Sequence, residues 1–156
     1  MGYLPNSFDN LTPLMNEISQ IMLEAVRKNY DAEGRPTKWA RLKSSTLKQR
    51  QKKGYTGKIL QRTGALKRSI QASYNESSAT VSTNLVYAAT HQYGAVISKS
   101  TLKTYLTKKR AGKDVAKPKS NRMSQWKIPA RPFMNLTPKD EEKIKKSIIS
   151  YLTKAG

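Results

Sequence analysis

The feature that most constrains this chain is the uneven distribution of its charge. The 156 residues carry 30 basic and 10 acidic side chains, a formal net charge of +20. Residues 34–139 hold 24 of the basic side chains but only two acidic ones, Glu76 and Asp114. Most of this excess lies in two blocks, twelve basic residues in Arg35–Arg68 and nine in Lys99–Arg122. Such blocks repel themselves, so we expect an anion beside them: nucleic acid, an acidic protein surface or anionic lipid. The alternative is that these lysines only increase solubility.

The composition supplies a core and excludes several kinds of site. Two Trp, eight Tyr and 37% hydrophobic residues give one domain enough packing material. The absence of cysteine excludes disulfides, thiolate metal sites and cysteine nucleophiles, and a single histidine, His91, excludes a two-histidine metal site. No apolar run approaches the length of a membrane span, and residues 1–10 lack the pattern of an export signal. We therefore expect a soluble protein made in the cytoplasm, with no cofactor and no membrane partner.

Two long helices are predicted from capping residues followed by an apolar stripe. The first begins at Thr12-Pro13, with Thr12 as the cap, and carries Leu14, Met15, Ile18, Ile21, Met22, Ala25 and Val26 on one face. The second begins at Thr137-Pro138 and carries Ile144, Ile148, Tyr151 and Leu152. Shorter helical segments are expected over Ser44–Lys53, after Thr63-Gly64, and within residues 85–94, where Gly94 would end the turn.

Strands are predicted in the middle of the chain. Residues 70–74 and 79–83 alternate apolar and polar side chains around a polar turn, which is typical of an antiparallel hairpin. Residues 126–133 contain two prolines and are expected to form an extended edge strand. Residues 98–124 lack a packing pattern and are expected to form a flexible basic arm, either extended or a hairpin. The predicted fold is α+β: one domain over residues 1–156, with helices packed on a small antiparallel sheet.

Catalytic patterns are weak in this sequence. Glu76 and Asp114 are too few for the carboxylate cluster with which nucleases bind magnesium. A serine triad through His91 is not excluded, but a structural histidine is the commoner outcome in a segment of small and aromatic residues. Gly54, Gly57 and Gly64 match neither a P-loop nor a dinucleotide fingerprint, and no helix-turn-helix or zinc-finger pattern is present. We therefore expect no enzyme activity and no sequence-specific reading of bases.

Four spaced motifs nevertheless occur together in the chain. They are Gly34-Arg35-Pro36 with Trp39 and Leu42; Leu60 with Thr63-Gly64-Ala65-Leu66 and Ser69-Ile70; Tyr87-Ala88 with His91-Gln92-Tyr93-Gly94; and Ile128-Pro129-Ala130-Arg131-Pro132-Phe133. In this order, across about residues 10 to 154, they resemble the phage virion morphogenesis family, the tail completion proteins of Mu-like and related tailed bacteriophages.

The resemblance implies roles for the motif residues in the core or at a subunit interface. These residues are Trp39, Leu42, Gly64, Leu66, Tyr87, His91, Gln92, Gly94, Pro129, Arg131, Pro132 and Phe133. Arg131, held between prolines, is expected to make a bidentate ion pair, either inside the fold or across subunits.

The resemblance also implies a structural virion protein at the head-tail junction or the head-proximal end of the tail, where it completes the tail and helps join it to the head. We expect a homo-oligomeric ring, taken as hexameric, in contact with tail tube or connector proteins. Six copies would carry six times the +20 of one chain, so DNA in the channel or acidic neighbours would be needed nearby. The candidate contacts with DNA or acidic partners are Lys99, Lys103, Lys108, Lys109, Arg110, Lys113, Lys117, Lys119 and Arg122. The alternative is a free nucleic-acid-binding protein that recognises the backbone without regard to sequence.

Overall fold

A computed structural model describes residues 10–98 and 125–155 of the chain. The first long helix is α1, Thr12–Asp31, with a proline in its first turn. The predicted Thr12 cap is wrong, because the Thr12 side chain makes no capping bond and Leu11 occupies the cap position. The Oδ1 atom of Asn10 accepts the Thr12 N–H instead, at 3.0 Å, and so satisfies one of the free donors at the helix start.

The predicted hairpin is confirmed, with strands β1, Ile70–Tyr74, and β2, Ala79–Thr83. Its antiparallel register pairs Ile70 with Thr83 and Tyr74 with Ala79. In the turn, the Oδ1 atom of Asn75 accepts the N–H groups of Ser77 and Ser78, at 2.9 and 2.7 Å. These bonds fix the turn and leave Glu76 exposed at its tip.

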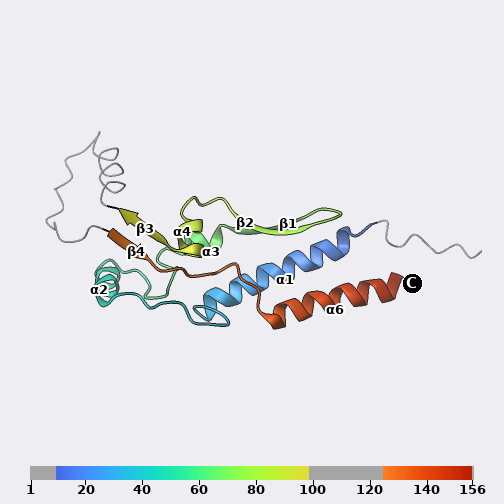
Figure 1. The fold of residues 1–156 in the computed structure, drawn as a ribbon, viewed down its shortest axis with the longest axis horizontal. Coiled ribbons are helices and arrows are strands. Elements are labelled where there is room, and N and C mark those ends of the chain that lie inside the picture. The colour runs from blue at the N-terminus through green and yellow to red at the C-terminus, as the bar shows by residue number, and fades with distance from the viewer. Residues whose placement is uncertain (1–9, 99–124, 156) are drawn as a thin grey trace, which may run out of the picture.

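The second long helix is α6, Pro138–Ala155, and it lies beside α1 on the side opposite the hairpin (Figure 1). The carboxylate of Asp140 accepts both the N–H and the hydroxyl of Thr137, at 3.0 and 2.6 Å. The side chain of Thr137 therefore donates to an acid in the first turn rather than capping the helix itself. The result is a layered arrangement of hairpin, α1 and α6.

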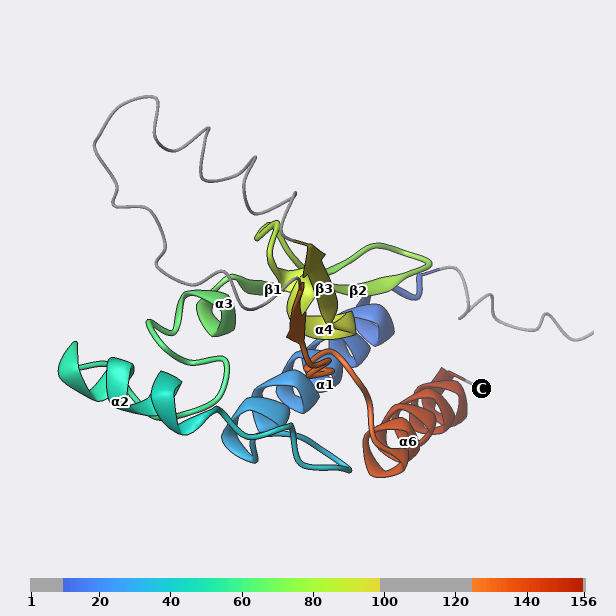
Figure 2. The same cartoon turned by 60° about the vertical axis from the view of Figure 1, so that its left-hand side comes forward.

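Three short helices and a second pair of antiparallel strands complete the described fold, and Figure 2 shows the first of these helices, α2, on the side of α1 away from α6. The helices are α2, Ser44–Lys52; α3, Ala65–Arg68; and α4, Ala88–Tyr93. Strands β3, Ala95–Ser98, and β4, Gln125–Ile128, pair antiparallel as a sheet separate from β1–β2. The strand expected over residues 126–133 thus ends at Ile128, because the two prolines that follow limit strand pairing.

The basic arm predicted at about residues 98–124 lies outside the described residues, apart from Ser98 at the end of β3. The nine candidate contacts between Lys99 and Arg122 lie outside them too. In the described part, helices and small antiparallel sheets confirm the α+β class.

The core forms where the C-terminal half of α1 meets the motif segments. Tyr30 is fully buried, and its ring centroid lies 5.6 Å from those of both Trp39 and Phe133. Ile59, Leu66, Ile70, Val26 and Ala88 complete this cluster. The burial of these aromatic side chains removes a large apolar area from water and holds segments together that are distant in the sequence.

Candidate functional site

An extended segment, residues 129–136, crosses the core and is held by side chains from three other parts of the chain. The Trp39 indole N–H donates to the Pro132 carbonyl at 3.0 Å. The Oε1 atom of Gln92 accepts the main-chain N–H groups of both Phe133 and Met134, at 2.9 and 3.1 Å. These bonds satisfy backbone groups that no strand partner serves, which explains why an indole and an amide stand at these positions.

A second set of polar bonds connects the end of α1 to the start of α6. The Asn29 amide is buried and donates to the carbonyls of Phe133 and Asn135, at 2.9 and 2.8 Å. The Arg35 guanidinium donates to Asn29 Oδ1 at 2.9 Å and to Asp140 Oδ2 at 3.0 Å. Each polar side chain in this network has hydrogen-bond partners, so the free-energy penalty for burying it is small. The network can therefore position the extended segment.

Asp140 is buried at the end of this network, with 4% of its surface exposed. Burial by itself raises the pKa of its carboxyl. The hydrogen bonds from Thr137 and the charge of Arg35 outweigh burial, so the pKa of Asp140 lies below its ordinary value of 3.8. The carboxylate is therefore ionised in the folded protein at neutral pH.

Arg131 is also buried, at 6% exposed. Its Nε and Nη2 atoms both donate to the Ala40 carbonyl, at 3.1 and 3.0 Å, and its main-chain N–H donates to the His91 carbonyl at 2.7 Å. Within residues 10–98 and 125–155, its guanidinium forms no ion pair. Within the described residues, the guanidinium therefore bonds one carbonyl oxygen rather than a carboxylate, and an ion pair across subunits stays a prediction.

Two motif glycines occupy left-handed backbone. Gly94, at φ 75°, joins α4 to β3, and a Cβ placed there would lie 2.8 Å from both the Ile128 carbonyl oxygen and the Ala130 nitrogen. Gly64, at φ 72°, precedes α3. A side chain at Gly94 would separate β3 from the strand end that it contacts, so the position requires glycine.

Beside this core lies a cavity of about 410 Å³. The described residues that line it are partly apolar and partly cationic and include no carboxylate: Leu42, Arg50, Leu60, Arg62, Thr63, Ala65, Leu66, Tyr87, His91 and Arg131. Five of these residues belong to the predicted motif set, and the cavity therefore brings together parts of all four motifs. Sequence reasoning missed Arg50 and Arg62, because nothing in a dense basic block distinguishes the two arginines that line a cavity from those that face solvent.

His91 contributes a buried Nδ1 atom for which the described residues provide no hydrogen-bond partner. Its ring lies edge-on to Tyr87, with 5.9 Å between centroids. Burial first, and then the charges of Arg131 and Arg50, lower the pKa of His91 below its ordinary value of 6.5. The imidazole is thus neutral at pH 7 in the isolated chain.

Comparisons with known proteins agree with the motif order. The model of the phage virion morphogenesis family matches residues 1–153. The chain belongs to this family. It is also 37% identical over 139 residues to Mu-like prophage FluMu G protein 2 of Haemophilus influenzae, an alignment that covers 89% of this chain and 76% of that protein. No solved structure matches the chain.

Family membership makes this chain a phage virion assembly protein. The family motifs then have a structural explanation here, because Trp39, Gln92 and Arg131 each bond the main chain of a segment distant in the sequence. Within the described residues, no cluster of three or more His, Asp or Glu side chains could hold a metal ion. None of the described helices is long and apolar enough to cross a membrane.

Proposed function

We propose that the chain is a structural, non-catalytic tail completion protein. It forms a ring at the head-proximal end of the tail, contacts the tail tube or the connector, and helps join the tail to the head. The family match over nearly the whole chain is the observation that carries this proposal. The relationship to a Mu-like prophage protein supports a tailed-phage setting.

Exposed apolar side chains support contacts between protein subunits. Val86 is 96% exposed, and Tyr93, on α4, is 79% exposed. Val96 on β3 and Trp126 on β4 also expose much of their apolar surface. Exposed apolar groups on and beside α4, β3 and β4 are typical of surfaces that other proteins cover.

The unneutralised charge supports contact with an anion in the assembled particle. Of the twelve basic residues in Arg35–Arg68, only Arg35 and Lys67 form ion pairs within the described part of the chain. The remaining positive charge would favour sequence-independent contact with the phosphates of the genome as it passes through the ring. The same charge favours the second candidate function, a free nucleic-acid-binding protein outside the virion.

Deletion of the corresponding phage gene tests the proposal. We expect DNA-filled heads and separate tails, seen by electron microscopy, with joined infectious particles restored when the protein is supplied from a plasmid. Mass spectrometry of purified wild-type particles should detect the chain. Normal infectious particles from the deletion would contradict the assembly role, and absence of the chain from virions would favour the free nucleic-acid-binding protein.

A further inference from the structure

Among the described residues, no carboxylate lines the cationic cavity. Arg50 donates from Nη1 to the Lys58 carbonyl at 2.9 Å, and Arg131 is bonded to the Ala40 carbonyl. Arg62 stacks over Tyr55, with 5.2 Å between its Cζ atom and the ring centroid. Within the described residues none of these three arginines forms an ion pair. Each guanidinium keeps N–H groups that a carbonyl partner has not used, since arginine has five.

These cations are close enough to disfavour one another's charge. Burial, and then the charge of Arg62, lower the pKa of Arg50, while burial and the charge of Arg50 lower that of Arg131. Together with the unpartnered Nδ1 atom of His91, they form a surface that an incoming anion would stabilise. A carboxylate entering the cavity would meet several donors at once.

The shape and lining favour a protein carboxylate over a nucleic-acid phosphate. Leu42, Leu60 and Leu66 line the same cavity as the arginines. A space of about 410 Å³ holds a few side chains, whereas a DNA duplex is a rod too wide to enter it. Apolar walls with a few directed donors are suited to one acidic side chain and its neighbours.

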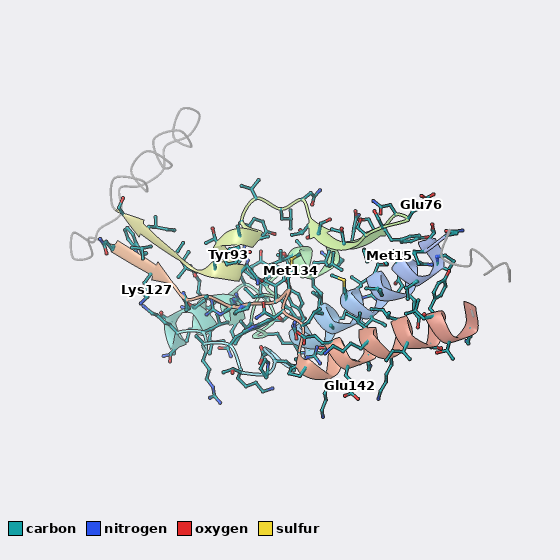
Figure 3. All side chains as sticks on the ribbon, turned by 45° about the vertical axis from the view of Figure 1, so that its right-hand side comes forward. Met15, Glu76, Tyr93, Lys127, Met134 and Glu142 are labelled. Carbon is teal, nitrogen blue, oxygen red and sulfur yellow. The ribbon has the colours of Figure 1, made fainter. Side chains whose placement is uncertain are left out.

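The chain itself carries an exposed acidic group far from the cavity. Glu76 is exposed at the turn of the β1–β2 hairpin and has no ion pair within the described residues. Figure 3 shows it near Met15, at the end of the molecule opposite Lys127 of β4. The cavity is lined by residues of α2, α3 and α4, and Figure 1 shows these helices away from the turn between β1 and β2, so one copy does not bring Glu76 to its own cavity. Complementary surfaces at opposite ends produce head-to-tail contacts, which generate rings when the rotation closes.

We propose that the hairpin turn bearing Glu76 of one copy inserts into the cavity lined by Arg50, Arg62 and Arg131 of the next copy. The inference rests on the proposed ring and names the contact that closes it. The Glu76 carboxylate accepts N–H groups from the arginines, and the small residues Ser77 and Ser78 allow the turn to enter. The site is complete only between two copies.

The cysteine-free chain allows a direct test in assembled phage particles. A variant with Glu76→Cys and Arg62→Cys is supplied to the deletion phage, and the purified particles are treated with an oxidant that joins nearby thiols. The proposal expects covalent dimers and higher multimers on a non-reducing gel. The matched control combines Glu76→Cys with Lys48→Cys, since Lys48 is exposed on the same helix as Arg50 but does not line the cavity. It should give no multimers.

A charge exchange keeps the proposal testable if the cysteine pair prevents assembly. Glu76→Arg and Arg62→Glu should each lower the yield of joined particles by about tenfold or more, and the combined variant should recover it. Joined particles that give no cross-link, or equal cross-linking through Lys48, would overturn the contact while leaving the tail completion role intact. A low yield of joined particles from Arg62→Glu together with a normal yield from Glu76→Arg would also overturn the contact. The carboxylate bound in the cavity would then belong to a different protein of the particle. Joined infectious particles from the deletion phage with no protein supplied would instead count against the proposed function.

Discussion

At the scale of single residues, Gln92 shows how a motif side chain supports the fold rather than a reaction. Its amide oxygen accepts two successive main-chain N–H groups, those of Phe133 and Met134. Its amide nitrogen contacts Asn135 Oδ1 at 3.2 Å. One side chain thus replaces the strand partner that residues 133–134 lack. Asn29 serves the carbonyls of the same segment, so both kinds of backbone group are satisfied.

Replacement of Gln92 should therefore lower the free energy of unfolding by more than the partial exposure of its side chain suggests. Gln92→Leu keeps the size of the side chain but removes the acceptor for two N–H groups, each worth about 1–3 kcal/mol when left unpaired. We expect the free energy of unfolding to fall by about 2–4 kcal/mol, measured by chemical denaturation. The control is Gln71→Leu on the exposed face of β1, which should change stability by less than about 0.5 kcal/mol. Equal effects of the two variants would show that the amide bonds contribute nothing specific.

Asp140 should make the stability of the folded chain depend on pH. Its pKa is lowered in the folded chain, so the folded state favours the carboxylate, and its contribution is present above the unfolded pKa near 3.8. This contribution should be lost progressively as the pH falls below about 4 and through the lower folded pKa. Asp140→Asn should be less stable than wild type at pH 7, and the difference should shrink toward pH 2. Denaturation curves measured across this range check the sign, and a difference that grows in acid would contradict it.

At the scale of elements, the junction between α4 and β3 depends on one glycine. Gly94→Ala would place a Cβ in left-handed backbone and 2.8 Å from two main-chain atoms, the Ile128 carbonyl oxygen at the end of β4 and the Ala130 nitrogen just after it. Gly54→Ala is the matched control, because Gly54 has a similar φ of 67° but nothing within 4 Å of the added Cβ. We expect a loss of about 1 kcal/mol for Gly54→Ala and at least about 2 kcal/mol more for Gly94→Ala. If thermal or chemical unfolding gave similar losses of stability for the two variants, β4 would be able to move away from the added Cβ at little free-energy cost.

The elements that sequence predicted well are those determined by neighbouring residues. The β1–β2 register follows from alternation on both sides of the Asn75 turn, and the start of α6 follows from Thr137 and the acid three residues later. Pairing of β3 with β4 was missed, because each strand has four residues and a long segment separates them. Alternation over so few residues is a weak signal, and no turn chemistry connects the two strands.

The candidate site was predictable only in part, for a similar reason. Motif spacing identified Trp39, Gln92 and Arg131. Their partners are carbonyl and N–H groups of the main chain, which every kind of residue carries, so the sequence does not reveal which residues they bond. The bonds from Asn29 join residues more than a hundred positions apart. The roles assigned to the basic residues between Lys99 and Arg122 stay predictions, since those residues lie outside the described structure.

At the scale of the whole molecule, the arginine-lined cavity and the exposed carboxylate of Glu76 lie apart. The basic residues of α2 and the arginine-lined cavity lie toward one end, and Glu76 lies at the other. The exposed apolar residues of α4, β3 and β4 lie nearer the basic end. Such polarity favours repeated head-to-tail contact over a symmetric pair. The positive charge not used between copies then remains available to DNA.

The positive charge outside the proposed contact predicts that the affinity for DNA depends on salt concentration. Isolated protein should bind DNA duplexes of different sequence with similar affinity, and the affinity should fall steeply with salt because bound phosphates release counterions. Lys108, Lys109, Arg110 and Lys113 changed together to Gln should reduce the slope of log affinity against log salt by about 0.9 for each phosphate contact removed. The control changes Lys143, Lys145, Lys146 and Lys154 of α6 to Gln, which removes the same charge from a nearly balanced region. A smaller change in slope for the control would assign the DNA contacts to the basic block, whereas equal changes would mean that net charge alone attracts DNA.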